Sequence, residues 1–205
     1  GVAIIRRENA AASSAKTLGG FENASLGILT GSVYDTYAKE RFPEAKREYY
    51  SSMSDMIVAL EQEKIDGYLS ENTYVIAAIW EGAKIQALDE VIDQTRAGFI
   101  FQKSPESAPL RAEMDAFIRA ATENGTLDQL KKKWFGNTEP SDHPDFDSLT
   151  GEKGTLRIAV SPDLKPLSYI KDGGLTGYEM EVLYLFAKEY GYKLDMSYMT
   201  FDAIL

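Results

Sequence analysis

The sequence predicts an α/β fold, and three observations lead to this prediction. Apolar residues make up 44% of the 205 residues, which is enough to build a core. Short apolar runs rich in β-branched residues alternate with longer segments in which apolar residues recur every three or four positions. Gly, Ser, Thr and Pro mark many of the boundaries between the two kinds of segment. Strands that alternate with helices in this way are typical of an α/β fold.

The first half of the chain contains three expected strands and three expected helices. The strands are residues 2–5, 25–29 and 65–69. The helices are residues 30–42, which Pro43 ends, a segment capped by Ser52 or Ser54, and residues 72–80.

The second half continues the alternation. Residues 98–101 are expected to form a strand, and Ser104-Pro105 to begin a helix that Asn124-Gly125 ends. The next helix begins at Thr126 and should bury Leu127, Leu130 and Trp134. The later elements are a strand at 156–160, a helix at 178–190 ended by Gly191, a strand at 193–198 and a first helical turn at 200–205. Both ends resemble cuts through secondary structure, so we expect the chain to be an excerpt of a longer protein.

Residues 138–153 differ from the rest of the chain and predict an acidic linker. Pro, Ser and acidic residues dominate this segment, which contains five acidic residues and one basic residue, Lys153. The only His of the chain, His143, lies in it. A metal site would need further ligands, so a solvated linker residue is the favoured interpretation of His143.

Composition excludes several functions. There are 22 Lys and Arg residues against 32 Asp and Glu residues, a net charge of −10, so we expect no nucleic-acid partner. The absence of Cys excludes disulfides, thiolate metal sites and Cys nucleophiles, and a single linker His excludes a Ser/His/Asp triad. No apolar run approaches the roughly 20 residues of a membrane span, and no signal peptide opens the chain. We therefore expect no catalytic residue, metal or cofactor.

Two strand-to-helix turns are the candidate sites. At Thr30-Gly31-Ser32-Val33 a strand leads into a helix, where free N–H groups and the Ser hydroxyl could bind an anion; the alternative is a plain βα turn capped by Ser32. Glu71 follows a second strand, where open α/β sheets bind ligands, and its carboxylate could accept bonds from an ammonium group. The alternative is an acid placed in the first helical turn by the helix dipole.

Several segments together resemble a known family. In the first part they are Thr30-Gly31-Ser32, residues 52–60, residues 64–68, Asn124-Gly125-Thr126-Leu127 and Lys133-Trp134-Phe135-Gly136. In the second part they are residues 155–163, 166–169, 174–182, Gly191-Tyr192 and 200–205. This pattern resembles the bacterial extracellular solute-binding proteins of family 3, the amino-acid-binding type of periplasmic binding protein (type II).

The order of these segments implies two tandem copies. The family has two α/β lobes that are joined by crossing strands and close on the ligand. By resemblance, residues 1–137 hold a crossing strand, lobe 2 and the C-terminal lobe 1 part of a first module, residues 138–153 are the acidic linker, and residues 154–205 are the N-terminal lobe 1 part of a second module. Residues 2–7 and 96–103 resemble the crossing strands. Lobe 1 is thus incomplete in both copies, and we expect 154–205 to pack against 104–137 as a substitute.

The resemblance also assigns site residues. Thr30, Gly31, Ser32 and Val33 match the turn that binds the ligand carboxylate, and Glu71 stands where the family usually has an Asp for the amino group. Val33 replaces a common second hydroxyl residue. In the second copy the pocket would include Ser161, Leu164 and Tyr169, with Leu164 and Leu167 where aromatic residues often hold the ligand. The family's carboxylate-binding arginine falls outside these residues, so we expect poor or no amino-acid binding by residues 1–205 alone.

Three functions are compatible with the resemblance. The first is extracytoplasmic capture of an amino acid or similar small polar solute for the membrane permease of an ABC importer. The second is the ligand-sensing module of a membrane sensor histidine kinase. The third is an enzyme, because a few relatives are dehydratases or are joined to wall-cleaving domains, but no acid/base constellation supports it. The importer is favoured, with a periplasmic or extracellular location and membrane association through the longer protein.

Overall fold

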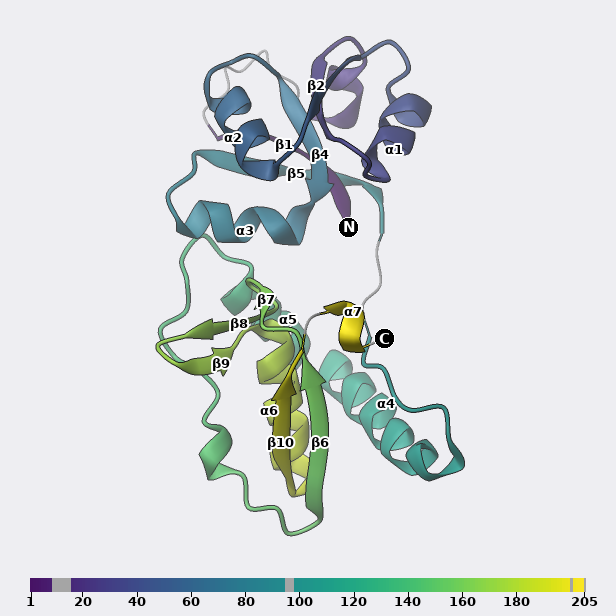
Figure 1. Cartoon of the computed structure of the whole chain (residues 1–205), viewed down its shortest axis with the longest axis vertical. Helices are drawn as coiled ribbons and strands as arrows, with labels where there is room; N and C mark the ends of the chain where they lie inside the picture. The colour runs from purple at the N-terminus through teal and green to yellow at the C-terminus, as the bar shows by residue number, and fades with distance from the viewer. Residues whose placement is uncertain (9–15, 95–97, 200, 205) are drawn as a thin grey trace. The chain divides into compact units, whose positions relative to one another are not determined.

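The computed structural model describes residues 1–8, 16–94, 98–199 and 201–204. The chain divides into two compact units, Gly1–Ala97 and Gly98–Leu205 (Figure 1). Each unit has its own strands and its own buried residues, and each is described by itself below.

The first unit is a five-stranded sheet with helices on both faces. Its elements are β1 (Val2–Arg7), the 3-10 helix η1 (Leu18–Phe21), β2 (Ser25–Leu29), α1 (Tyr34–Arg41), β3 (Lys46–Tyr50), α2 (Met53–Glu61), β4 (Gly67–Glu71), α3 (Asn72–Trp80) and β5 (Ile85–Asp93). The strand order is β3-β2-β4-β1-β5. Strand β2 runs parallel to β3 and β4, and β1 runs antiparallel to β4 and β5.

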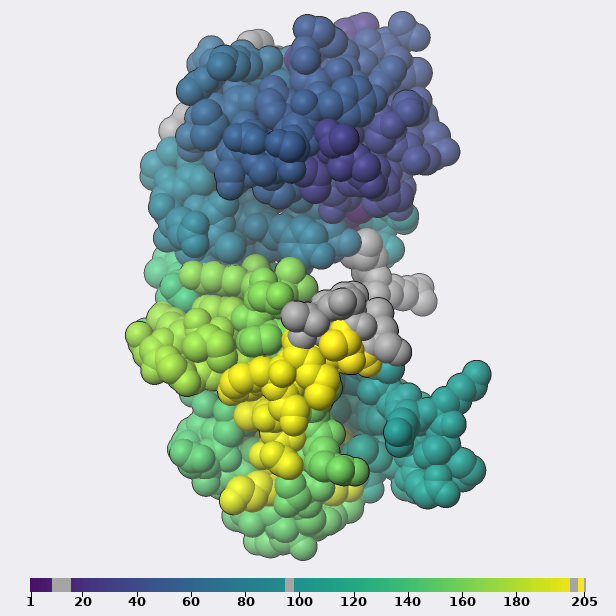
Figure 2. All heavy atoms as spheres, viewed as in Figure 1, coloured from purple at the N-terminus to yellow at the C-terminus, as the bar shows by residue number. Residues whose placement is uncertain are grey.

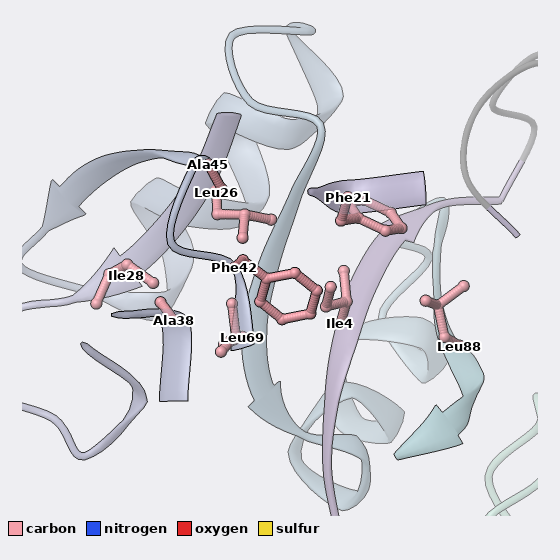
Figure 3. Packing of buried hydrophobic residues seen from close by; sticks show 9 residues of the cluster. All are labelled: Ile4, Phe21, Leu26, Ile28, Ala38, Phe42, Ala45, Leu69 and Leu88. Atoms are coloured by element: carbon pink, nitrogen blue, oxygen red, sulfur yellow. The ribbon is translucent and has the colours of Figure 1, made fainter. Parts of the chain in front are cut away.

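Neighbouring residues of the central strands pack on opposite faces of this sheet. Ile4 and Leu69 lie in one cluster, together with Phe42 and other residues of the α1 side (Figure 3). Ile5 and Tyr68 lie in a second cluster, which contains residues of α2 and α3. Because both faces are covered, the central strands appear in the sequence as nearly continuous apolar runs.

The second unit combines helices with two small sheets. Its elements are the 3-10 helix η2 (Pro105–Ser107), α4 (Ala108–Glu123), α5 (Thr126–Trp134), the 3-10 helix η3 (Phe146–Ser148), β6 (Gly154–Val160), β7 (Asp163–Leu164), β8 (Ser168–Lys171), β9 (Gly174–Thr176), α6 (Tyr178–Tyr190), β10 (Tyr192–Tyr198) and α7 (Phe201–Ile204). Strands β6 and β10 form a parallel pair, and β7-β8-β9 form an antiparallel sheet (Figure 1).

Helices α4 and α5 pack against α6 and β10, as expected for residues 104–137 and 154–205. The rings of Phe117 and Phe186 meet edge to face with centroids 5.7 Å apart. The Tyr192 hydroxyl donates a hydrogen bond of 2.8 Å to Glu113. Trp134, which is fully buried, donates through Nε1 to the carboxylate of Glu181. The predicted packing of the two segments is therefore confirmed.

The structure differs from the sequence-based expectations in three respects. Residues 98–101 are not a strand, because 98–103 form neither helix nor strand; residues 95–97 lie outside the described residues. Strands β3, β5 and the β7–β9 sheet were not predicted. Residues 138–153 were expected to be an acidic linker; four of their five acids are exposed, but Pro140 and Leu149 are buried and Glu139 is bonded to Tyr169.

Candidate functional site

The topology of the first unit brings two predicted site segments to the same edge of the sheet. Strands β2 and β4 are parallel neighbours, with Leu26 level with Gly67 and Gly27 level with Tyr68. Continuing this register by three or four residues places the turn after β2 level with the end of β4. After β2 the chain crosses to β3 on one side, and after β4 it crosses by α3 to β5 on the other. Such a reversal marks the crevice where open α/β sheets bind ligands.

The turn after β2 differs in one respect from a simple capped helix. Helix α1 begins at Tyr34, with Val33 at the N-cap position, so the alternative of Ser32 as the N-cap is wrong. The Ser32 hydroxyl donates instead to the carbonyl oxygen of Leu29 at 2.6 Å, and the Ser32 N–H donates to the same oxygen at 3.1 Å. Gly31 has a φ of +77°, a conformation that favours glycine. Ser32 therefore tightens the turn that presents the start of α1.

Glu71 lies at the end of the neighbouring strand β4. It is the last residue of β4 and the N-cap residue of α3, and it is half-buried. Sequence reasoning did not include two neighbours, Tyr34 and Ser70. Burial raises the pKa of Tyr34, and Glu71 and Ser70 are among the groups near its hydroxyl. The sequence gives no signal that Tyr34 lies close to Ser70 and Glu71. This proximity arises from the pairing of β2 with β4.

The predicted residues of the second copy lie together in the second unit. Leu164 pairs with Ser168 across β7 and β8, and the Ser168 hydroxyl donates to the carbonyl oxygen of Ser161 at 2.6 Å. The Ser161 hydroxyl donates to the Asp163 carboxylate. Tyr169 is buried, and its hydroxyl donates to Glu139 at 2.8 Å. Within this unit the hydroxyl groups of Ser161 and Tyr169 are thus engaged in protein hydrogen bonds.

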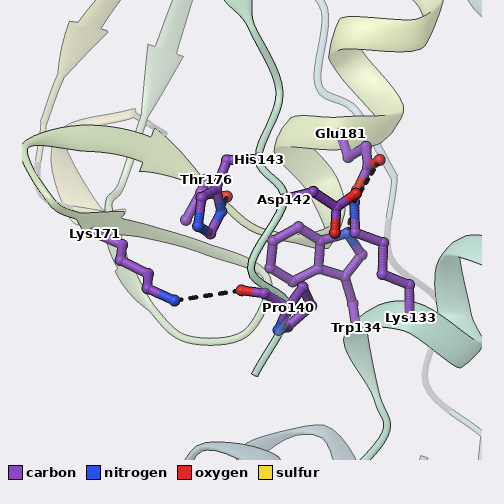
Figure 4. A network of polar contacts seen from close by, with 8 residues as sticks. All are labelled: Lys133, Trp134, Pro140, Asp142, His143, Lys171, Thr176 and Glu181. Carbon is purple, nitrogen blue, oxygen red and sulfur yellow. Dashed lines mark hydrogen bonds and ion pairs between the residues drawn. The ribbon is translucent and has the colours of Figure 1, made fainter. Parts of the chain in front are cut away.

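Side chains of the predicted linker contact α5 and the β7–β9 sheet of the second unit (Figure 4). Lys133 forms ion pairs with Asp142 at 2.7 Å and with Glu181 at 2.8 Å. The Nδ1 atom of His143 lies 2.9 Å from the Thr176 hydroxyl. His143 is exposed, as expected for a solvated residue, but tertiary contacts hold this segment against the rest of the unit. In the part of the chain that the structure describes, no group of three or more His, Asp and Glu residues is arranged to bind a metal ion.

Solved structures define the class of fold. A crystal structure of substrate binding domain 2 of Lactococcus lactis GlnP in an open conformation superimposes with a TM-score of 0.51 at 19% identity, over 60% of this chain and 53% of that one. The L-cystine solute receptor of Neisseria gonorrhoeae gives a TM-score of 0.54 at 17% identity, over 66% of this chain and 56% of that one. The chain therefore has the α/β fold of two-lobed type II periplasmic binding proteins.

Sequence comparison matches one segment of the chain to a family. Residues 156–205 match the bacterial extracellular solute-binding proteins, family 3, which confirms the resemblance for this segment. The arginine-binding extracellular protein ArtP of Bacillus subtilis is 24% identical over 137 residues, which cover 64% of this chain and 51% of ArtP. The chain thus spans about half the length of this relative. No helix among the described residues has both the length and the apolar character that a bilayer span requires.

Proposed function

We propose that this chain belongs to a protein that binds an amino acid or a similar small polar solute outside the cytoplasm and delivers it to the membrane permease of an ABC importer. The observation that carries the proposal is the parallel register of β2 and β4, which brings the turn at residues 30–33 level with Glu71. Adjacent strands lie about 4.8 Å apart, so an α-amino acid could reach both segments at once.

The two segments have opposite chemical preferences, as a zwitterion requires. The start of α1 presents the positive end of the helix dipole, which suits a carboxylate, although the Ser32 N–H and hydroxyl already donate to Leu29. The Glu71 carboxylate suits an ammonium group. Thr30, Gly31, Ser32 and Val33 would thus orient the carboxylate end of the ligand, and Glu71 the amino end. The second set, Ser161, Leu164 and Tyr169, would belong to the pocket of a second copy.

The tandem arrangement is part of the same proposal. Residues 1–137 would end a first module, residues 138–153 would connect the modules, and residues 154–205 would begin a second. The match of the family to 156–205 and the name of the GlnP structure, a second substrate binding domain, support this order. The location would be periplasmic or extracellular, with membrane association through the longer protein. None of the three relatives named above is described as part of a sensor kinase, so the importer is the function we propose.

The proposal is tested by titrating the isotope-labelled chain with arginine, glutamine and cystine and following backbone amide shifts by NMR. Because the carboxylate-binding arginine of the family is absent from these residues, we expect weak binding, with a Kd on the order of 1 mM. Saturable shifts should concentrate at residues 30–34 and 70–72. Glu71→Gln should abolish them for the amino acids, whereas Glu81→Gln, an exposed acid at the other end of α3, should not.

Two outcomes would contradict the proposal. Glu71 would have no role in binding the ammonium group if the shifts were spread evenly over the chain. The same conclusion would follow if simple carboxylates without an amino group gave the same shifts. Nanomolar binding by this chain would instead show that the missing arginine is dispensable.

A further inference from the structure

A carboxylate of the second unit is bound by three donors in a manner that resembles ligand recognition. The Oε1 atom of Glu139 accepts a hydrogen bond of 2.8 Å from the Tyr169 hydroxyl. The Nζ atoms of Lys165 and Lys171 lie 3.4 Å and 3.5 Å from the same oxygen. The side chains of Glu139, Lys165 and Lys171 are only 25–28% exposed, so water screens these charges less than at an open surface.

The donors and the acceptor come from different parts of the chain. Lys165 lies between β7 and β8, and Tyr169 and Lys171 lie on β8, so one hairpin positions all three donors. Glu139 belongs to the segment that follows α5, and the Lys171 Nζ atom also donates to the Pro140 carbonyl oxygen of this segment at 3.3 Å. The green atoms of the second unit form one continuous surface in Figure 2. The donor set is therefore built by the hairpin, and Glu139 enters it from outside.

The hairpin is well suited to hold these donors in place without Glu139. The Tyr169 ring is buried and meets the fully buried Trp134 ring edge to face, with centroids 6.3 Å apart. The Lys165 Nζ atom lies over the Tyr169 ring, 5.3 Å from its centroid. Packing thus fixes the Tyr169 hydroxyl and keeps one cation beside it. The donors line an open depression with a volume of about 370 Å³, which is large enough for a small organic anion.

The local charge favours an anion here, although the chain as a whole is acidic. Two lysines face one carboxylate, and the other acid that lines the depression, Asp163, accepts the hydroxyl of Ser161. Burial alone would raise the pKa of Glu139, but the Tyr169 hydroxyl and the two lysines outweigh it and lower that pKa. Glu139 is therefore bound as a carboxylate.

We propose that Lys165, Tyr169 and Lys171 form a carboxylate-binding site that Glu139 occupies as an intramolecular ligand. In this role Glu139 latches residues 138–149 to the β7–β9 sheet. When the Glu139 side chain is absent, the site binds a small free carboxylate in its place. The site lies wholly within the second unit and does not depend on the residues at the ends of β2 and β4.

The test is chemical rescue of the 205-residue Glu139→Ala variant by acetate. Replacing Glu by Ala removes a CH2–COO⁻ group, which acetate matches in size and charge. We expect Glu139→Ala to lower the melting temperature by several degrees, since about 1 kcal/mol corresponds to 4–8 °C in a unit of roughly 100 residues. Sodium acetate should restore at least half of this loss, whereas sodium chloride of equal ionic strength should not.

Three comparisons make the test specific. The wild-type chain should respond equally to acetate and chloride, because Glu139 already fills the site. Glu123→Ala, which removes an exposed acid at the end of α4, should show no acetate-specific effect. Tyr169→Phe combined with Glu139→Ala should lose the rescue, because the hydroxyl donor is gone, while the aromatic packing on Trp134 is kept.

The outcomes that overturn the proposal are distinct. An unchanged melting temperature in Glu139→Ala would show that Glu139 is no latch, and a loss without acetate-specific recovery would show that the lysines and Tyr169 form no site. Rescue that persists with Tyr169→Phe would exclude the donor set. If Glu139→Ala folds only in acetate, the proposal stands. If Glu139→Ala folds in neither salt, while Glu139→Gln folds, acetate has failed to rescue the variant and the proposal is wrong. None of these results depends on amino-acid binding at the other unit.

Discussion

Replacing Glu181 with Ala should destabilise the second unit, because Glu181 connects α6 to the end of α5. Its carboxylate accepts the Nε1–H of Trp134 and forms an ion pair of 2.8 Å with Lys133. Trp134 is fully buried, and the side chains of Lys133 and Glu181 are 21% and 16% exposed. The substitution therefore leaves a buried N–H group without its acceptor.

The magnitude follows from these contacts. A buried donor that loses its partner costs about 1–3 kcal/mol. Lys133 keeps its second ion pair, with Asp142 at 2.7 Å. Losing the ion pair between Lys133 and Glu181 therefore costs only a fraction of about 1 kcal/mol. Glu181 also lies in the first turn of α6, where an acid contributes about 0.3–1 kcal/mol, but Ala has the higher helix propensity and offsets much of this. We expect a net loss of about 2 kcal/mol.

The assay is urea unfolding followed by tryptophan fluorescence in a Trp80→Phe background. Trp80 lies in the first unit and Trp134 in the second, so this background makes the emission report the second unit alone. With a denaturant dependence of about 1–3 kcal/mol per molar, a loss of about 2 kcal/mol lowers the midpoint by about 1 M. The matched control is Glu189→Ala, an exposed acid on the same helix, which should change stability by less than about 0.5 kcal/mol. Equal midpoints for the two variants would refute the reasoning.

Three further substitutions test other features of the chain. Burial raises the pKa of Glu179, so ionisation of Glu179 lowers the stability of the folded state as the pH rises above about 4.5. Glu179→Gln should therefore raise the melting temperature at pH 7 but not at pH 4. The control Glu189→Gln should change the melting temperature at neither pH. A lower melting temperature of Glu179→Gln at pH 7 would contradict this. Gly177 has a φ of +123°, and a Cβ atom there would lie 2.3 Å from a backbone oxygen, so Gly177→Ala should cost more than about 3 kcal/mol in urea unfolding, against about 1 kcal/mol for Gly173→Ala, which meets open space. Ser52 accepts the N–H of the residue three positions on at 3.1 Å, so Ser52→Ala should cost about 1 kcal/mol by the same measurement, and a neutral result would exclude a capping role.

Elements with strong periodicity and clear end signals could be predicted from the sequence. The burial of Leu127, Leu130 and Trp134 in α5 is confirmed, because three apolar residues at helical spacing leave only one face for the core. Helix α6 has its predicted bounds, and Gly191 ends it with a φ of +75°, as a C-terminal glycine does.

The two missed strands of the first sheet share one physical property. Strands β3 and β5 are its edges, so each pairs with one neighbour only. Edge strands carry charged residues that discourage pairing with other chains, and β3 has the sequence Lys-Arg-Glu-Tyr-Tyr. Neither strand therefore has the apolar run by which central strands are found. Residues 98–101 show the opposite case, because a strand was predicted there and none is formed. This apolar run pairs with no sheet, and Ile100 is 72% exposed.

The candidate site could be predicted only in its separate parts. The turn at 30–33 and Glu71 follow from local strand-to-helix order, but their proximity depends on β4 crossing back to pair with β2. The contacts of Tyr34 with this crevice are likewise tertiary. For residues 138–153 local composition predicted the exposure of most of the acids, but not the contacts of Glu139 and Asp142 with lysines on other elements.

These lysines explain how a segment with a net charge of −4 remains attached to an acidic chain. Asp142 pairs with Lys133 on the preceding helix, and Glu139 pairs with Lys165 and Lys171 on the following hairpin, so the segment bridges the elements on its two sides. Trp134 contributes to the helix contact and to one of these attachments, since its indole N–H binds Glu181 on α6 and its ring packs against Tyr169. Loss of Glu139 should therefore leave the α5–α6 contact intact, whereas loss of Trp134 should weaken the latch and the helix contact together. The two experiments proposed above, acetate rescue and Glu181→Ala, consequently separate the attachment of this segment from the packing of the helices.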